Sequence, residues 1–231
     1  MAVIETRSGG AGPATPRAID VRRLGLVDYH DGLNLQKQLV EERRSGAIGD
    51  TLLLLQHPPV ITLGVKTRGE RTHIVASEDQ LLAEGVEVVE TGRGGDITYH
   101  GPGQLVGYPI FDLNPDRRDV HHYVRDLEEV LIRAAARFGI EARRVQGLTG
   151  VWVGEPGREE KLAAIGIRIS RWITSHGFAL NVSTNLDHFN LIVPCGIADR
   201  GVTSLSRLLG RDVTMAEAED AVVAGMGVFS G

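Results

Sequence analysis

Near its centre the chain reads Arg93-Gly94-Gly95-Asp96-Ile97-Thr98-Tyr99-His100-Gly101-Pro102-Gly103-Gln104-Leu105-Val106-Gly107-Tyr108-Pro109. Five glycines and two prolines interrupt this segment, yet apolar and aromatic residues lie between them. Glycine lets the main chain approach a ligand closely because it has no Cβ, and Gly101-Pro102-Gly103 predicts a sharp bend. Arg93 and His100 add hydrogen-bond donors towards its two ends. The segment therefore predicts either a tight hairpin between two strands or a backbone cradle for a ligand.

The length and composition predict one large domain. The chain has 231 residues, of which 42% are apolar and 24% charged, as in ordinary globular proteins. It has no apolar run of about twenty residues that would span a membrane, and its start lacks a signal-peptide pattern. Residues 1–17, which include Gly9-Gly10-Ala11-Gly12-Pro13, are expected to be a flexible tail, and residues 18–231 a catalytic domain.

Charge and cysteine content narrow the classes of function. The formal net charge of −5 argues against a nucleic-acid binder. A single cysteine, Cys195, rules out an intramolecular disulfide and fits the reducing cytoplasm. The histidines show no metal-ligand spacing, so we expect no metal. Local basic groups are either solvated faces or docking points for an acidic partner, and they are Arg117-Arg118, Arg125, Arg143-Arg144, and Arg168 with Arg171.

The hydrophobic pattern predicts a mixed α+β fold. Strands are expected at residues 19–26, 51–55, 60–63, 86–89, 105–113, 150–153, 162–169 and 178–182. Helices are expected at residues 29–44, 81–84, 119–139, 204–209 and from 214 towards 229. Asp28, Asp119 and the capping box at Thr214 mark three helix starts. Because several strands follow one another between well-separated helices, we expect one domain with a central mixed sheet and packed helices.

Three side chains are candidates for chemistry. Cys195 lies between Pro194 and Gly196, after the apolar residues 191–193, and its local context fits a buried small residue or a nucleophile. A nucleophilic thiol needs help, because only a few per cent is ionised at neutral pH. Lys161 begins an otherwise apolar strand, where it either ends the strand in solvent or loses its proton beside apolar walls. His176 is either structural or an acid–base group.

Several common catalytic patterns are missing from the sequence. Thr203-Ser204-Leu205 supplies hydroxyls without the nucleophile elbow of serine hydrolases. Gly92-Arg93-Gly94-Gly95 is neither a phosphate-binding Walker A loop nor a dinucleotide fingerprint. A cysteine peptidase also has little support, since no signature pattern surrounds the cysteine.

Taken together, these segments resemble the lipoyl(octanoyl) transferase family, over residues 19–229. The resemblance is carried by residues 54–60, 93–109, 161–166, 176–181, 192–197 and 202–205. It implies the fold of biotin- and lipoate-ligase catalytic domains. It also implies transfer of an octanoyl or lipoyl group from acyl carrier protein to a lysine of lipoyl-accepting domains. Those acceptors belong to 2-oxoacid dehydrogenase E2 subunits and to the glycine cleavage H protein.

The resemblance also implies roles for individual residues. Cys195 matches the cysteine that carries the acyl chain as a thioester, and Lys161 matches the lysine that lowers the pKa of that thiol and acts as acid and base. The expected substrate-binding residues are Arg93, Gly94, Gly95, Asp96, Ile97, Thr98, Tyr99, His100, Ala164, Ile165, Gly166, Gly177, Phe178 and Ala179. No cofactor is implied.

The residues themselves suggest how such a reaction would proceed. The apolar sides of Ile97, Leu105, Ile165 and Phe178 are expected to line an acyl slot, and backbone N–H groups near Gly196 or Gly166 would steady the oxyanion. Two other functions stay open. One is an ATP-dependent lipoate or biotin ligase, which shares the implied fold, and the other is a non-catalytic module that binds an acyl carrier or a lipoyl domain.

Overall fold

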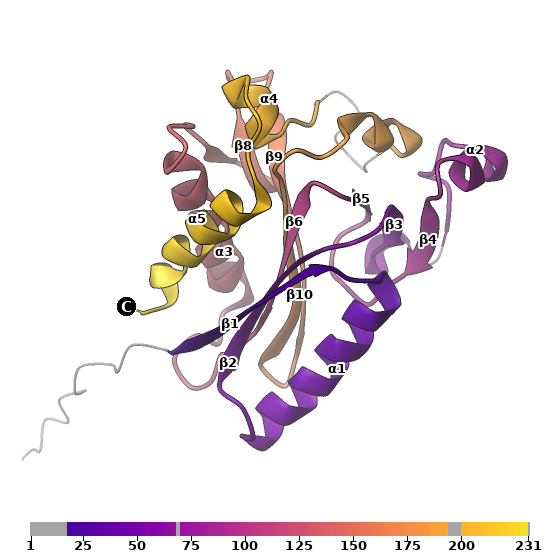
Figure 1. Cartoon of the computed structure of the whole chain (residues 1–231). Helices are drawn as coiled ribbons and strands as arrows, with labels where there is room; N and C mark the ends of the chain where they lie inside the picture. The colour runs from indigo at the N-terminus through magenta and orange to yellow at the C-terminus, as the bar shows by residue number, and fades with distance from the viewer. Residues whose placement is uncertain (1–17, 68–69, 194–199, 231) are drawn as a thin grey trace, which may run out of the picture.

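A seven-stranded sheet runs through the centre of the molecule in the order β1-β2-β6-β10-β9-β8-β7 (Figure 1). The structure, a computed structural model, describes residues 18–67, 70–193 and 200–230. The strands of this sheet are β1 (Ile19–Leu26), β2 (Asp50–Gln56), β6 (Gln104–Ile110), β7 (Arg143–Val145), β8 (Leu148–Val153), β9 (Glu160–Ser170) and β10 (Ile173–Asn181). Only β1 and β2 pair in parallel within this sheet, and the neighbours from β2 to β7 are antiparallel.

A second sheet of three strands lies beside it, in the order β4-β3-β5. It is built from β3 (Val60–Leu63), β4 (Glu87–Glu90) and β5 (Ile97–His100). The short helices η1 (Val65–Thr67), α2 (Glu78–Ala83) and η2 (Leu186–Leu191) accompany it. Apolar side chains of this sheet pack with Leu81 of α2 and with Ile192, so the small sheet has a core of its own.

The leucine run of β2 explains why the large sheet is covered on both faces. Leu52 and Leu54 belong to the cluster on one face, and Leu53 and Leu55 belong to the cluster on the other. All four side chains are fully buried. Because neighbouring residues of a strand point to opposite faces, a continuous apolar run is stable only where both faces are covered.

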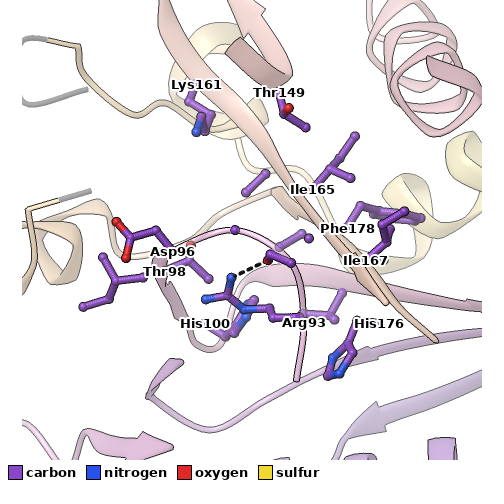
Figure 2. A pocket seen from close by; sticks show the side chains of 18 of the residues that line it. Arg93, Asp96, Thr98, His100, Thr149, Lys161, Ile165, Ile167, His176 and Phe178 are labelled. Atoms are coloured by element: carbon purple, nitrogen blue, oxygen red, sulfur yellow. Dashed lines mark hydrogen bonds between the residues drawn. The ribbon is translucent and has the colours of Figure 1, made fainter. Parts of the chain in front are cut away.

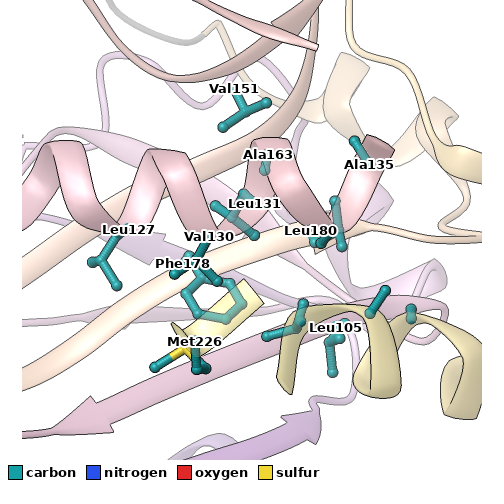
Figure 3. Packing of buried hydrophobic residues seen from close by; sticks show 14 of the residues in the cluster. Leu105, Leu127, Val130, Leu131, Ala135, Val151, Ala163, Phe178, Leu180 and Met226 are labelled. Carbon is teal, nitrogen blue, oxygen red and sulfur yellow. The ribbon is translucent and has the colours of Figure 1, made fainter. Parts of the chain in front are cut away.

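Helices on the two faces complete the layers (Figure 1). On one side lie α3 (Val120–Ala136) and α5 (Met215–Gly225), followed by η3 (Met226–Ser230), with α4 (Leu205–Leu209) near the sheet edge. On the other side lies α1 (Tyr29–Ser45). Figure 3 shows Leu127, Val130 and Leu131 of α3 packed against Leu180 and Phe178 of the sheet. The buried apolar stripe of α3 is the one that its sequence spacing predicts.

The predicted helix starts are confirmed. Asp28 caps α1, Asp119 caps α3, and Thr214 forms a capping box with Glu217 at the start of α5. Two helix boundaries differ by three residues: α2 begins earlier than expected, because Ser77 and Gln80 form a capping box there, and α3 ends at Ala136. Arg137 and Gly139 continue as a turn, in which Gly139 takes a positive φ of 74°. Among the strands, β10 begins at Ile173 rather than at residue 178, and β6 ends at Ile110 rather than at residue 113.

Of the two alternatives for residues 93–109, the hairpin is wrong. β5 pairs with β3 in the small sheet, whereas β6 pairs with β2 and β10 in the large sheet. The turn at Gly101-Pro102-Gly103 therefore carries the chain from one sheet to the other. Gly103 has a φ of 82°, and a Cβ there would come within 2.8 Å of the Ser183 backbone.

Some expectations cannot be compared with this structure. The flexible tail at residues 1–17 lies outside the described residues, as do Cys195 and Gly196. Among the described residues, no helix is both long and apolar enough to cross a membrane.

Candidate active site

A cavity of about 440 Å³ lies between the two sheets, beside β9 and β10. Figure 2 shows Lys161 at one end of it, His176 at the other, and Arg93 with His100 between them. Nearly all the predicted site residues within the described part of the chain line this cavity: Arg93, Gly94, Gly95, Asp96, Ile97, Thr98, His100, Lys161, Ala164, Ile165, Gly166, Gly177, Phe178 and Ala179. Segments far apart in sequence, from β5, β9 and β10, thus converge on one space.

Two predicted lining residues lie elsewhere. Tyr99 is buried in the core of the small sheet, and its hydroxyl is 2.6 Å from Nδ1 of His188. Leu105 was expected in the acyl slot but lies in the large core beneath α3 and α5. Its neighbour Val106 lines the cavity instead, because consecutive side chains of β6 point to opposite faces of the sheet.

Glycines allow the loop before β5 to form one wall. The N–H of Gly94 donates to the carbonyl oxygen of Ile167 on β9, at 2.8 Å. A Cβ at Gly166 would come within 2.9 Å of the Gly94 carbonyl oxygen, and a Cβ at Gly64 would come within 2.5 Å of the Gly95 oxygen. The loop is therefore held against two other segments at positions where only glycine fits, whereas the binding of a ligand by this segment stays a prediction.

Arg93 fixes this loop from within. Its guanidinium is almost fully buried and donates to the carbonyl oxygen of Thr62 at 2.6 Å, to the Thr62 hydroxyl at 2.9 and 3.1 Å, and to the Gly94 carbonyl oxygen at 3.1 Å. Burial lowers the pKa of Arg93. A guanidinium in this position joins β3 to the loop, and it gives the inner part of the cavity a positive potential.

His100 and His176 line the cavity and His57 is buried beside His100, and burial keeps all three neutral at pH 7. Burial lowers the pKa of His100 to about 3, and those of His57 and His176 to about 4. Gln104 donates through Nε2 to the Tyr99 carbonyl and to Asn181, so its Oε1 accepts from Nδ1 of His100 at 2.7 Å. His100 therefore carries its proton on Nδ1 and presents Nε2 as an acceptor.

Lys161 is one of two lysines that line the cavity, the other being Lys66. Its backbone is held on both sides by the segment that follows Arg200: its N–H donates to the Gly201 carbonyl at 2.9 Å, and its carbonyl accepts from the Thr203 N–H at 3.0 Å. Within the described residues, no carboxylate lies within ion-pairing distance of its Nζ. Burial lowers the pKa of Lys161 to about 8, so the amine is mostly protonated at pH 7 but loses its proton far more readily than an exposed lysine. The alternative of a solvated strand end does not describe this residue.

The sequence interpretation missed several lining residues. Thr149, Trp152, Asn181 and Arg200 also line the cavity. Trp152 lies on β8 opposite Lys161, with its ring centroid 4.7 Å from Nζ. The available signal was Gly150, because glycine inside a strand often marks a bulge or a close backbone approach.

Most of the basic groups considered for docking already have carboxylate partners. Arg117 pairs with Asp126 at 2.7 Å, Arg125 with Glu128 at 2.6 Å, and Arg143 with Glu159 at 3.4 Å. Arg144 contacts both Glu128 and Glu129. These pairs favour the interpretation of these arginines as partly solvated structural groups. The described residues contain no group of three or more His, Cys, Asp or Glu side chains that could hold a metal ion.

A family model for the lipoyl protein ligase A/B catalytic domain matches residues 28–227. The chain belongs to this family. Curated relatives include the octanoyltransferase of Myxococcus xanthus, 58% identical over 88% of this chain, and that of Chloroflexus aggregans, 54% identical over 91%. The chain spans 57% of the length of the Myxococcus protein and 94% of the Chloroflexus protein. Its membership of this family and its identity to these relatives identify the chain as an acyltransferase that transfers octanoyl groups in protein lipoylation.

Solved structures of a lipoate protein ligase and of a biotin protein ligase share the fold. A lipoate protein ligase of Thermoplasma acidophilum superposes with a TM-score of 0.67 at 16% identity, and covers 90% of this chain and 82% of its own. The biotin protein ligase of Aquifex aeolicus gives a TM-score of 0.55 at 16% identity, and covers 90% of this chain and 70% of its own. The predicted ligase-like α+β fold is thereby confirmed.

Proposed function

We propose that this member of the lipoyl protein ligase A/B family takes an octanoyl group from acyl carrier protein and passes it to a lysine of a lipoyl domain, through a thioester on Cys195. The observation that carries the proposal is the position of Lys161: an amine without a carboxylate partner among the described residues, in a cavity lined by apolar side chains and glycine backbone as well as by polar groups such as Arg93 and His100. Such an amine can hold or release a proton near neutral pH.

In the first step, the Cys195 thiolate attacks the carbonyl carbon of the carrier-bound thioester. A new carbon–sulfur bond forms, the bond to the carrier's thiol breaks, and the leaving thiolate takes a proton from the Lys161 ammonium. Lys161 is then neutral. Exchange of one thioester for another is nearly isoenergetic, so the step needs neither ATP nor a metal ion.

In the second step, the amine of the acceptor lysine attacks the enzyme thioester. A carbon–nitrogen bond forms, the bond to Cys195 breaks, and Lys161 removes the proton that the attacking amine loses. The thiolate and the ammonium are then restored. Formation of an amide from a thioester is downhill, which makes the second step the one that drives transfer.

The cavity wall supplies the binding energy for the acyl chain in this proposal. Ile97, Ile165, Phe178 and Val106 offer apolar surface. Burying about seven methylene or methyl groups at roughly 0.8 kcal/mol each would contribute several kcal/mol. We also propose that the acceptors are lipoyl domains of 2-oxoacid dehydrogenase E2 subunits and the glycine cleavage H protein, and that the enzyme acts in the cytoplasm.

Intact-mass analysis tests the proposal directly. Wild-type protein incubated with octanoyl-acyl carrier protein should gain one octanoyl group, and addition of a lipoyl domain should move that group to the domain. The Cys195→Ala variant should gain none, and an adduct that persists on it would remove Cys195 from the mechanism. Modification that requires ATP and free octanoate would instead identify a ligase.

The role of Lys161 needs a separate measurement. The rate of alkylation of Cys195 as a function of pH reports the pKa of its thiol. Lys161→Ala should raise that pKa, because the stabilising ammonium is lost. An unchanged alkylation curve would exclude Lys161 from activation of the thiol.

A further inference from the structure

A β-bulge turns Lys161 out of the core. Val151 of β8 pairs with Ala163 of β9, but the next residue, Trp152, pairs with Lys161 rather than with Leu162. Leu162 is thus an extra residue on β9, and it is buried together with Ala163 in the core beneath α3. In a regular strand Lys161 would share a face with Ala163. The extra residue reverses this and places Lys161 on the cavity side with Ala164.

Gly150 supports this bulge. Its φ of +120° is one that other residues rarely adopt. A Cβ at Gly150 would come within 2.6 Å of the Ala163 carbonyl oxygen and 3.7 Å of Cε of Lys161. The backbone of β8 therefore approaches β9 more closely here than a side chain would allow, directly beside the lysine.

The indole of Trp152 then covers the ammonium. Residues directly opposite each other in an antiparallel pair have neighbouring side chains, and Nζ of Lys161 lies 4.7 Å from the centroid of the Trp152 ring. Trp152 is fully buried, so close packing restricts its ring. The guanidinium of Arg200 lies 6.0 Å from the centroid of the same ring.

We propose that Trp152 is a positioning residue for Lys161, and that its aromatic face holds the ammonium at the cavity wall, where no carboxylate of residues 18–67, 70–193 or 200–230 pairs with it. The inference rests on the proposed role of Lys161 in acyl transfer. A ring face attracts a cation within about 6 Å of its centroid, most strongly for tryptophan. The contact fixes the direction of a long, flexible side chain that has no hydrogen-bonded partner in the described residues.

Other titratable groups line the same cavity as Lys161. They are Arg93 and Asp96 on the loop before β5, Lys66 of η1, the neutral His100 and His176, and Arg200. Glu160 lies beside Lys161 on β9, and Glu160 is 3.7 Å from Arg207 of α4. Burial lowers the pKa of Lys161 because it disfavours the charged amine. The indole face has the opposite effect on this pKa, because it attracts the ammonium form.

Removal of the ring should therefore lower the pKa of Lys161 further. Trp152→Leu keeps an apolar wall but loses the aromatic face, and the expected fall is about 0.4 to 1.5 pKa units, from the strength of cation–aromatic contacts. Trp152→Phe keeps a ring face and should restore most of the wild-type value. Trp172→Leu, which removes the only other tryptophan, should leave the pKa of Lys161 unchanged.

NMR of the full chain labelled with ¹³C-lysine measures this without reference to catalysis. The chain has only three lysines, Lys37, Lys66 and Lys161, and the Lys161 signal is identified by its loss in Lys161→Met. In the wild type, the terminal methylene of Lys161 should be shifted by the ring current of Trp152, whereas those of Lys37 and Lys66 should not. This measurement needs no Trp152 variant, so it holds even where Trp152→Leu fails to fold.

Two results would overturn the inference. One is an unshifted Lys161 methylene signal in the wild type. The other is a pKa of Lys161 in Trp152→Leu that is equal to or above that of the wild type, which would make the indole only a barrier to water. Failure of the proposed function is distinguishable, because it would appear as an absent acyl-enzyme while the ring-current shift and the titration stayed as expected.

Discussion

Gly166 of β9 lies directly against the carbonyl oxygen of Gly94, which a Cβ at Gly166 would approach to 2.9 Å. The same Cβ would lie 3.3 Å from Cδ of Arg93. Gly94 is also tied to β9 by its hydrogen bond to Ile167. Absence of one side chain on β9 therefore sets how close the loop before β5 lies to the sheet, and with it the width of the cavity.

Gly166→Ala should push this loop outward and impair acyl transfer. Because the obstructing atom is backbone, the loop must shift, at about 1–3 kcal/mol of stability. A displacement near 1 Å in a substrate-positioning segment can reduce kcat/KM by roughly 100-fold. Steady-state transfer of the octanoyl group and urea denaturation measure the two effects. Gly49→Ala is the matched control, since nothing lies within 4 Å of a Cβ there; equal activity of the two variants would contradict the prediction.

Arg93→Met should destabilise the fold even though it removes a buried charge. The guanidinium makes four hydrogen bonds to Thr62 and Gly94, and a methionine leaves those acceptors without their donor. The expected loss is about 2–3 kcal/mol in the free energy of unfolding. Arg133→Met, which removes an exposed pair with Glu129 on α3, should lose at most about 0.5 kcal/mol. An Arg93→Met protein as stable as the wild type would show that burial of the charge outweighs its hydrogen bonds.

Much of the fold was predictable because local signals agree with the final packing. Asp28 and Asp119 cap helices at the expected residues, and the continuous leucines of β2 lie in a strand buried on both faces. The split between β5 and β6 was not predictable in the same way. Consecutive strands joined by a tight turn usually pair, and here tertiary packing of β5 on β3 overrides that tendency.

In the candidate site, too, some positions were predictable from the sequence and others depend on tertiary packing. Most of the Arg93–His100 segment and Lys161 do meet at one cavity, as the resemblance implies. Tyr99 departs from the expectation because it packs in the core of the small sheet. Trp152 could not be assigned to the site, since its contact with Lys161 depends on a bulge, and a regular register would have placed it opposite Leu162. Sequence alternation alone does not reveal which of two neighbouring residues is left unpaired.

Lys161→Met should abolish transfer and yet stabilise the protein at pH 7. The folded-state pKa of about 8 lies below the unfolded value near 10.5, so the folded protein holds its proton less tightly than the unfolded chain. That difference opposes folding at every pH below about 8, and its effect fades between pH 8 and 10.5. Methionine fills a similar volume without a charge, and we expect a gain of about 1–3 kcal/mol at pH 7 that shrinks above pH 9. Urea denaturation at pH 7 and pH 10 measures it; a loss of stability at pH 7 would show that the ammonium has a compensating partner.

His57→Gln should make the protein less sensitive to acid. Burial lowers the pKa of His57 to about 4, whereas the unfolded chain titrates near 6.5. Between these values the unfolded state binds the extra proton, so stability falls with decreasing pH by up to about 1.4 kcal/mol per unit for each such histidine. Loss of the hydrogen bonds to Val27 and Tyr108 lowers stability at every pH, but the slope between pH 6.5 and 5 should become shallower.

His30→Gln is the matched control, because the pKa of His30 is raised in the folded protein whereas that of His57 is lowered. Its hydrogen bond and charge interaction with Glu87 raise the pKa of His30, so the folded protein binds that proton more tightly than the unfolded chain. This interaction stabilises the protein at pH values below the unfolded pKa and is lost as the pH rises through the folded value. Its removal should therefore leave the acid slope equal or steeper, whereas removal of His57 should reduce it. Chemical denaturation of both variants at pH 5, 6 and 7 gives the two slopes, and a shallower slope in His30→Gln than in His57→Gln would show that burial of His57 does not govern the acid response.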